Sequence, residues 1–156
     1  METLKNLRVS QKVLIVSNSA WSLYNFRLPL ARALREHGIT SVFVSPFDQY
    51  VEKIRFEGFR WIELKMSRRG LNPLVEFLTF LSFFFIYKRE KPIAVHHFTI
   101  KCILYGSFAA FLTKIPAVIN ALTGLGSVFL DVNLKMSVVR PFVKFFYRKA
   151  LSAKQV

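Results

Sequence analysis

Short runs of consecutive apolar residues alternate along this chain with longer segments in which apolar positions recur every three or four residues. The first pattern is typical of strands buried on both faces, and the second of amphipathic helices. Five strands are predicted, over residues 12–17, 40–46, 59–66, 93–98 and 117–122. Helices are predicted over residues 25–38, 48–58, 73–90, 99–114 and 137–150. This alternation predicts an α/β fold with a Rossmann-like, doubly wound parallel sheet.

Polar residues at the helix boundaries support these bounds. Asn25 is expected to cap the first helix, with Pro29 in its first turn, and Gly38 is expected to end it. Asp48 is expected to cap the second helix. Asn72 is expected to cap the third, with a proline at its first position. The chain has no internal repeat or linker, so residues 12–150 are expected to form one domain after a basic lead at residues 1–11.

The charge balance of the 156 residues is strongly basic. Lys and Arg number 23 against 9 Asp and Glu, a net charge of +14, which predicts an anionic partner. Seventeen phenylalanines lie among other apolar residues and beside Lys and Arg, a mixture that suits a bilayer interface better than nucleic acid. The lone Cys102 excludes an internal disulfide, and no residues have metal-ligand spacing. We expect an anionic membrane surface as a partner, with no nucleic acid and no metal.

The segment over residues 71–87 is apolar nearly all round. It reads as buried core, as an interfacial helix, or as a span at the lower limit of length. The last predicted helix has an apolar face beside a basic line, the pattern of a membrane-surface element. The expected membrane contacts are Phe83, Phe84, Lys88, Arg89, Arg140, Lys144 and Arg148.

Candidate chemistry gathers where the predicted strands end. Ligands of doubly wound sheets bind outside the carboxyl ends of the strands, which here carry SNSAWSLYN, HHFTIK and TGLG. The turn after the first strand lacks glycine, so a nicotinamide-dependent dehydrogenase is not expected. Gly124 and Gly126 mark either a close approach of backbone to ligand or a tight turn. His96 is either a base or a hydrogen-bonded structural residue, and the same alternatives hold for His97.

Three segments carry a family resemblance: NSAWSLYNFRLPLARALREHG, HHFTIKCILYGSFAA and VINALTGLGSVF. They resemble the amino-terminal half of family 4 glycosyltransferases that build capsule, O-antigen and other polyprenyl-linked glycans. The resemblance implies the first of two Rossmann-like domains of a GT-B enzyme. In that architecture the first domain holds the acceptor and the second holds the nucleotide-sugar. A donor domain would be expected to follow the tail at residues 151–156, and this chain is expected to bind no cofactor.

The resemblance also implies roles for individual residues. His96 would lie near the reacting sugar. Many members of the family have a second histidine two residues after the first (HxH), but here that position is Phe98. The adjacent His97 is therefore the second candidate. The residues implied to bind acceptor or phosphate are Asn18, Ser19, Tyr24, Arg27, Thr99, Lys101, Thr123, Gly124 and Gly126.

The function so implied is acceptor binding in a glycosyltransferase. The enzyme would be peripheral on the cytoplasmic side of the cell membrane and would transfer a sugar to a polyprenyl-diphosphate-linked glycan. The chain alone would be inactive, whether as a truncated piece, as the product of a disrupted gene, or as one subunit of a split enzyme. Two alternatives remain: a non-catalytic, membrane-recruiting subunit, and a basic nucleic-acid-binding domain.

Overall fold

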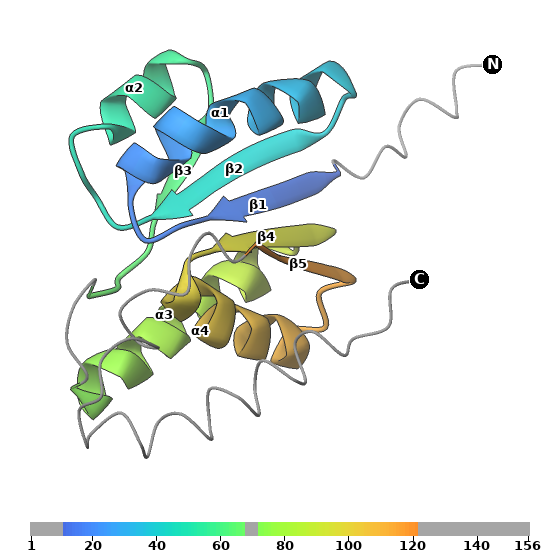
Figure 1. The fold of residues 1–156 in the computed structure, drawn as a ribbon. Coiled ribbons are helices and arrows are strands. Elements are labelled where there is room, and N and C mark those ends of the chain that lie inside the picture. The colour runs from blue at the N-terminus through green and yellow to red at the C-terminus, as the bar shows by residue number, and fades with distance from the viewer. Residues whose placement is uncertain (1–10, 68–71, 122–156) are drawn as a thin grey trace.

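Strands and helices alternate throughout the part of the chain that the computed structural model describes, residues 11–67 and 72–121 (Figure 1). The elements are β1 (Lys12–Val16), α1 (Ala20–Glu36), β2 (Thr40–Ser45), α2 (Val51–Phe56), β3 (Arg60–Glu63), α3 (Pro73–Glu90), β4 (Ala94–Phe98), α4 (Ile100–Leu112) and β5 (Ala117–Ala121). The five predicted strands are all present. The predicted helix over residues 137–150 lies outside the described residues.

The sheet has the strand order β3-β2-β1-β4-β5, and all its neighbours are parallel. The chain leaves β1 for β2 on one side and later returns to pair β4 on the other side, with Val16 in register with both Val44 and His97. This reversal next to β1 is the topological switch of a doubly wound sheet. The predicted fold class is confirmed.

Helices cover both faces of the sheet (Figure 1). On one face α1 and α2 pack around Ile15, Phe43 and Phe98, and on the other α3 and α4 pack around Leu14 and Val95. Burial on both faces explains why the central strands are continuous apolar runs instead of alternating ones.

The first helix is capped six residues before the residue that the sequence suggested. Ser19 is its cap, because its hydroxyl accepts a hydrogen bond from the Ser22 amide at 3.2 Å. Asn25 lies inside the helix and donates its side-chain amide to the Trp21 carbonyl at 2.8 Å. Pro29 is therefore internal, beyond the first turn. Serine and asparagine are equally good caps, so composition alone did not separate them.

Of the other boundary predictions, those for Asn72 and Gly38 are confirmed and that for Asp48 is wrong. Asn72 caps α3 as expected, accepting from the Leu74 amide at 3.0 Å, and Gly38 follows the end of α1 with a positive φ. Asp48 instead stands three residues before α2. Its carboxylate accepts from the Tyr50 amide at 2.9 Å and from the Trp21 amide at 3.1 Å. That carboxylate ties the β2–α2 loop to the start of α1.

Helix α3 packs one side against the sheet and exposes the other. Phe83 is fully buried among core residues, so the expectation that it contacts a membrane is wrong. Phe84 is half-buried, and Lys88 and Arg89 are exposed. Within the described residues no helix is long and apolar enough to span a membrane.

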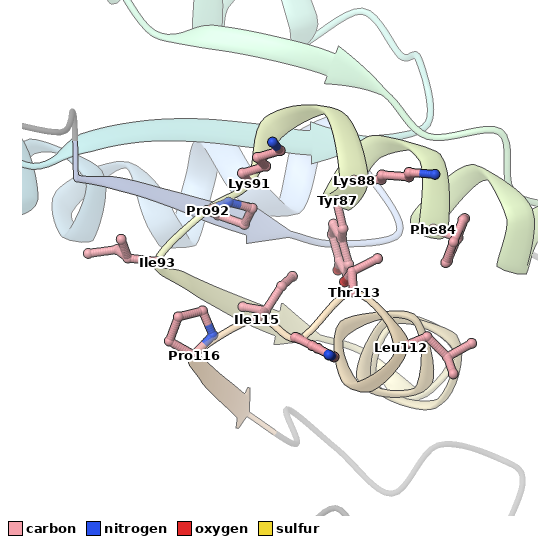
Figure 2. A pocket seen from close by; sticks show the side chains of 11 residues that line it. Phe84, Tyr87, Lys88, Lys91, Pro92, Ile93, Leu112, Thr113, Ile115 and Pro116 are labelled. Carbon is pink, nitrogen blue, oxygen red and sulfur yellow. The ribbon is translucent and has the colours of Figure 1, made fainter.

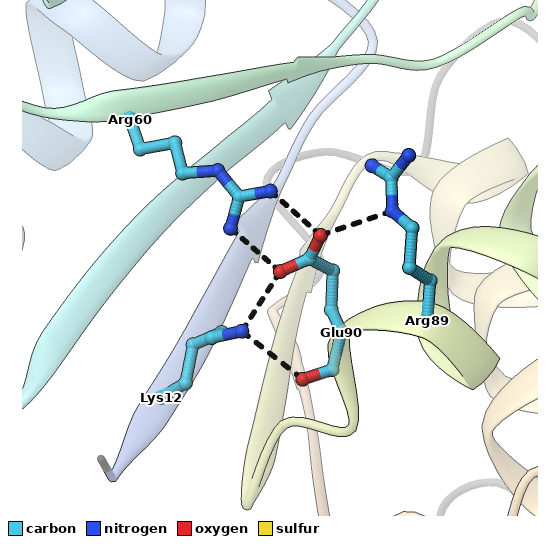
Figure 3. Close-up of polar contacts among 4 residues, drawn as sticks. All are labelled: Lys12, Arg60, Arg89 and Glu90. Atoms are coloured by element: carbon cyan, nitrogen blue, oxygen red, sulfur yellow. Dashed lines mark hydrogen bonds and ion pairs between the residues drawn. The ribbon is translucent and has the colours of Figure 1, made fainter.

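The buried carboxylate of Glu90 forms ion pairs at the edge of the sheet where the strands begin (Figure 3). Both oxygens of Glu90 accept from the Arg60 guanidinium at 2.7 Å, Lys12 Nζ lies 2.8 Å from Oε2, and Arg89 Nε lies 3.2 Å from Oε1. Burial alone would raise the pKa of Glu90, but the hydrogen bonds from Arg60 and Lys12 outweigh it and lower that pKa to about 2. The cluster joins the end of α3 to the starts of β1 and β3.

Candidate functional site

The carboxyl ends of β1 and β4 lie side by side at the topological switch, and we call this part of the sheet the switch edge. Ser17 and Asn18 follow β1, and Thr99 follows β4. Helices α1 and α4 both begin at this edge, so their first-turn amides and the positive ends of their dipoles lie there. This is the position where doubly wound sheets bind ligands, and an anion is favoured there.

Three buried polar atoms at this edge have no hydrogen-bond partner among the described residues. They are Ser17 Oγ, Arg27 Nε and Thr99 Oγ1, and Ser17 is fully buried. An unpaired buried polar group costs about 1–3 kcal/mol, so most such groups in folded proteins are paired. Their gathering at the switch favours a polar ligand there.

The backbone of Thr99 is strained. Its φ of 75° and ψ of 148° lie in a region that a β-branched residue rarely adopts, at a typical cost of about 1–3 kcal/mol. Its hydroxyl does not cap α4, although its carbonyl accepts from the Ile103 amide at 3.0 Å. Strain of this kind is concentrated at functional sites. Nothing in the sequence signalled it.

Arg27 and His96 meet on the ring of Phe98. The Arg27 guanidinium carbon lies 3.8 Å from the ring centroid, and the centroids of His96 and Phe98 are 4.2 Å apart. Burial, and then the charge of Arg27, lower the pKa of His96, which is half-buried. The lowered pKa favours the neutral imidazole, in which one ring nitrogen can accept a proton. Phe98, the residue that departs from the HxH pattern, contacts both Arg27 and His96 with its ring.

His97 lies on the opposite face of β4, inside the core. Its Nε2 is 2.6 Å from the Tyr87 hydroxyl and its Nδ1 is 2.8 Å from Asn120 Oδ1. Because the amide oxygen only accepts, Nδ1 carries the proton and the Tyr87 hydroxyl donates to Nε2. Burial lowers the pKa of His97 to about 4, against the opposing effect of the Asn120 hydrogen bond. This environment favours a structural role for His97.

The remaining expected site residues are spread over the edge. Lys101 Nζ is 2.6 Å from Glu76 Oε1 and 3.2 Å from the Ser67 carbonyl, so it links α4 to α3 and to the loop after β3. Tyr24 lies in the seam between α1 and α2, beside Tyr50 and Lys53. The loop residues Thr123, Gly124 and Gly126 lie outside the described residues, as do the expected membrane contacts Arg140, Lys144 and Arg148.

The fold and the position of this edge define the class of protein: one Rossmann-like domain of GT-B type. A crystal structure of MurG from Acinetobacter baumannii matches with a TM-score of 0.57 at 18% identity, over 83% of this chain and 38% of MurG. UDP-GlcNAc 2-epimerase from Neisseria meningitidis, solved with UDP-GlcNAc, matches with a TM-score of 0.60 at 19% identity, over 86% of this chain and 38% of that one. At these identities the likeness concerns the fold alone.

The chain belongs to the glycosyl transferase 4-like family, whose sequence profile matches residues 12–154. A curated relative from Campylobacter jejuni, N,N'-diacetylbacillosaminyl-diphospho-undecaprenol alpha-1,3-N-acetylgalactosaminyltransferase, is 31% identical over 140 residues. The match covers 85% of this chain and 35% of that enzyme, so the chain spans about a third of the relative's length. The expected membership of the glycosyltransferases is confirmed.

Proposed function

We propose that this chain is the acceptor-binding domain of a glycosyltransferase that transfers a sugar from a nucleotide-sugar to a polyprenyl-diphosphate-linked glycan. Family membership supports sugar transfer, and the printed activity of the Campylobacter relative supports a lipid-diphosphate acceptor. The observation that carries the proposal is the cluster of Ser17, Arg27 and Thr99 beside His96 at the switch edge. The nucleotide-sugar binds a second domain or subunit, and the enzyme is peripheral on the cytoplasmic side of the cell membrane.

Each group at the edge has a role in this proposal. In the transfer the acceptor hydroxyl attacks the anomeric carbon, its proton passes to a base, and the bond from that carbon to the nucleotide diphosphate breaks. His96, half-buried and favoured in its neutral form, is the base or the hydrogen-bond partner of that hydroxyl. Arg27 and the first turn of α4 stabilise diphosphate charge, because a guanidinium and helix amides both bind phosphate oxygens. Thr99, which is partly exposed, supplies its hydroxyl to the acceptor.

Binding of the acceptor alone tests the proposal without a donor domain. A short-chain, water-soluble polyprenyl-diphosphate sugar would be titrated into the chain by calorimetry, and UDP-N-acetylglucosamine would be titrated in parallel. We expect the first to bind and the second not to. Arg27→Gln should weaken binding about tenfold, since a charge-assisted hydrogen bond contributes about 1.5–3 kcal/mol. Arg32→Gln on the outer face of α1 is the matched control. Binding of the nucleotide-sugar alone would refute the proposal.

A non-catalytic, membrane-recruiting subunit is the second candidate. It is favoured by large apolar side chains that α3 and α4 leave exposed. The two candidates differ in one measurement, sugar transfer in the presence of a donor domain or subunit. If His96→Ala leaves product formation unchanged there, this chain recruits but does not take part in the chemistry.

A further inference from the structure

Helices α3 and α4 expose an unusual number of large apolar side chains. We call this surface the apolar ridge; its residues are Leu74, Phe77, Leu78, Phe85, Phe108, Phe111 and Leu112, each at least 42% exposed. The spacing on α3 places its members along one side of the helix. The rings of Phe80 and Phe108, 5.3 Å apart, join the two helices. Contiguous exposed apolar surface of this kind marks a site of interaction with a protein or a membrane.

Among the described residues of α3 and α4, the exposed charges beside the apolar ridge are positive. The only acidic residues of α3 and α4 are Glu76 and Glu90, whose side chains are 12% and 4% exposed and are held in ion pairs. Lys88 and Arg89, in contrast, are exposed at the end of α3. Arg89 shares the single Glu90 carboxylate with Arg60 and Lys12, so the described part of this surface combines apolar contact with a net positive charge.

A pocket of about 570 Å³ lies between the ends of the two helices (Figure 2). We call it the basic pocket. Among the described residues, Lys88, Lys91 and Lys114 line it, no acidic residue does, and none of the three lysines forms an ion pair. Its other walls are mostly apolar, formed by Phe84, Pro92, Ile93, Leu112, Ile115 and Pro116, with Tyr87 and Thr113. Leu112 belongs to both the pocket and the apolar ridge.

We propose that the apolar ridge and the basic pocket together dock onto an anionic phospholipid bilayer, with a headgroup phosphate held among the three lysines. Lysines near helix C-termini are favoured by the helix dipole alone, but that does not account for apolar walls continuous with an exposed apolar surface. A phospholipid meets both requirements, since its phosphate faces the ammonium groups and its chains face the Phe and Leu side chains.

This inference deepens the proposed function, since a lipid-linked acceptor is met at a bilayer. The ridge begins with Leu74 and Phe77, in the first turns of α3, and Glu76 between them holds Lys101 at the start of α4. Docking along the ridge therefore brings the switch edge close to the membrane surface. The basic pocket lies at the other end of the same two helices.

Vesicle co-sedimentation of the full chain tests the charged half of the proposal. The vesicles are phosphatidylcholine alone and phosphatidylcholine mixed with phosphatidylglycerol, and we expect binding to the mixture at physiological ionic strength. The variant combines Lys88→Gln, Lys91→Gln and Lys114→Gln. Each lysine close to an anionic surface contributes roughly a fivefold factor, so the variant should bind on the order of 100-fold more weakly. The matched control combines Arg32→Gln, Lys53→Gln and Arg55→Gln, which removes the same charge from α1 and α2.

The apolar half is tested by Phe85→Ser with Phe111→Ser, against Phe56→Ser as control, because Phe56 is 93% exposed on α2. The first variant should bind the mixed vesicles at least tenfold more weakly, and the control should bind as wild type.

Several results would overturn the proposal. Equal loss in both charge variants would mean that net charge alone drives adsorption. Displacement by millimolar inorganic phosphate, at constant ionic strength, would mean a site for a soluble anion. A lower melting temperature of the Phe85/Phe111 variant with unchanged vesicle binding would mean that the ridge is covered within the chain, and conversion of a dimer to a monomer would mean a second copy. The readout is vesicle binding, so it fails or succeeds independently of acceptor binding at the switch edge.

Discussion

Gly106 of α4 lies directly against the imidazole of His97 in β4, so closely that a methyl group at position 106 would overlap the ring. The ring has no room to move away, because Tyr87 and Asn120 hold its two nitrogens from either side. Packing against the His97 ring therefore explains why a glycine, Gly106, lies inside α4. The helix and the strand approach each other only because this position has no side chain.

Gly106→Ala is expected to destabilise the protein by about 1–3 kcal/mol. Alanine favours a helix over glycine by about 1 kcal/mol, but overlap with a fixed buried ring and loss of its hydrogen bonds outweigh that gain. Urea denaturation followed by circular dichroism measures the change. In a double-mutant cycle with His97→Ala the two losses should be less than additive, because the ring is then absent. An alanine variant as stable as wild type would contradict this packing.

The hydrogen bond from Tyr87 to His97 gives a second expectation. Tyr87→Phe removes the donor and leaves Nε2 buried and unpaired, which costs about 1–3 kcal/mol. Tyr50→Phe, on a half-buried tyrosine packed beside Tyr24, is the control, and it should cost less because its environment is partly open to solvent. Equal losses in the two variants would argue against a paired His97.

The pH dependence of stability follows from the same residue. The pKa of His97 is lowered by burial from 6.5 to about 4, so below pH 6.5 the unfolded chain binds a proton that the folded chain does not. This contribution is complete above pH 6.5 and is lost as the pH falls toward 4, up to about 3 kcal/mol. Urea denaturation at pH 7.5, 6 and 5 measures the loss. The slope should be smaller in His97→Gln, and an unchanged slope would assign it to other groups.

Much of this fold could be predicted from the sequence because its signals are local. Continuous apolar runs such as residues 13–16 mark strands buried on both faces, and the cap of α3 lies beside its proline. The site was predictable only as a set of strand ends. Which side of β4 each histidine faces depends on the helices packed there, and the strain at Thr99 depends on how β4 meets α4. The apolar composition of α3 likewise could not show that Phe83 faces inward and Phe85 outward.

The Glu90 cluster makes a prediction about the far edge of the sheet. Glu90→Gln should cost about 2 kcal/mol, below the value for a fully buried pair because Arg60 and Lys12 are partly exposed. Glu52→Gln is the matched control, since its pair with Arg55 is exposed, and it should change stability little. With its pKa lowered from 4.5 to about 2, Glu90 contributes stability that is lost only as the pH falls through that range, below the window of His97.

Substitutions of Thr99 separate the effect of its strained backbone on stability from the effect of its hydroxyl on acceptor binding. Glycine adopts φ of 75° without the steric cost that threonine has, so Thr99→Gly should raise stability by up to about 1 kcal/mol after the entropy of glycine in the unfolded chain is subtracted. The same change removes the hydroxyl and should weaken binding of the soluble polyprenyl-diphosphate sugar. Thr99→Ser keeps the hydroxyl and should retain that binding, whereas Thr99→Ala should lose it without the gain in stability. If Thr99→Gly binds the acceptor as well as wild type does, the strained threonine has no part in recognition, and Arg27 with the helix amides must suffice.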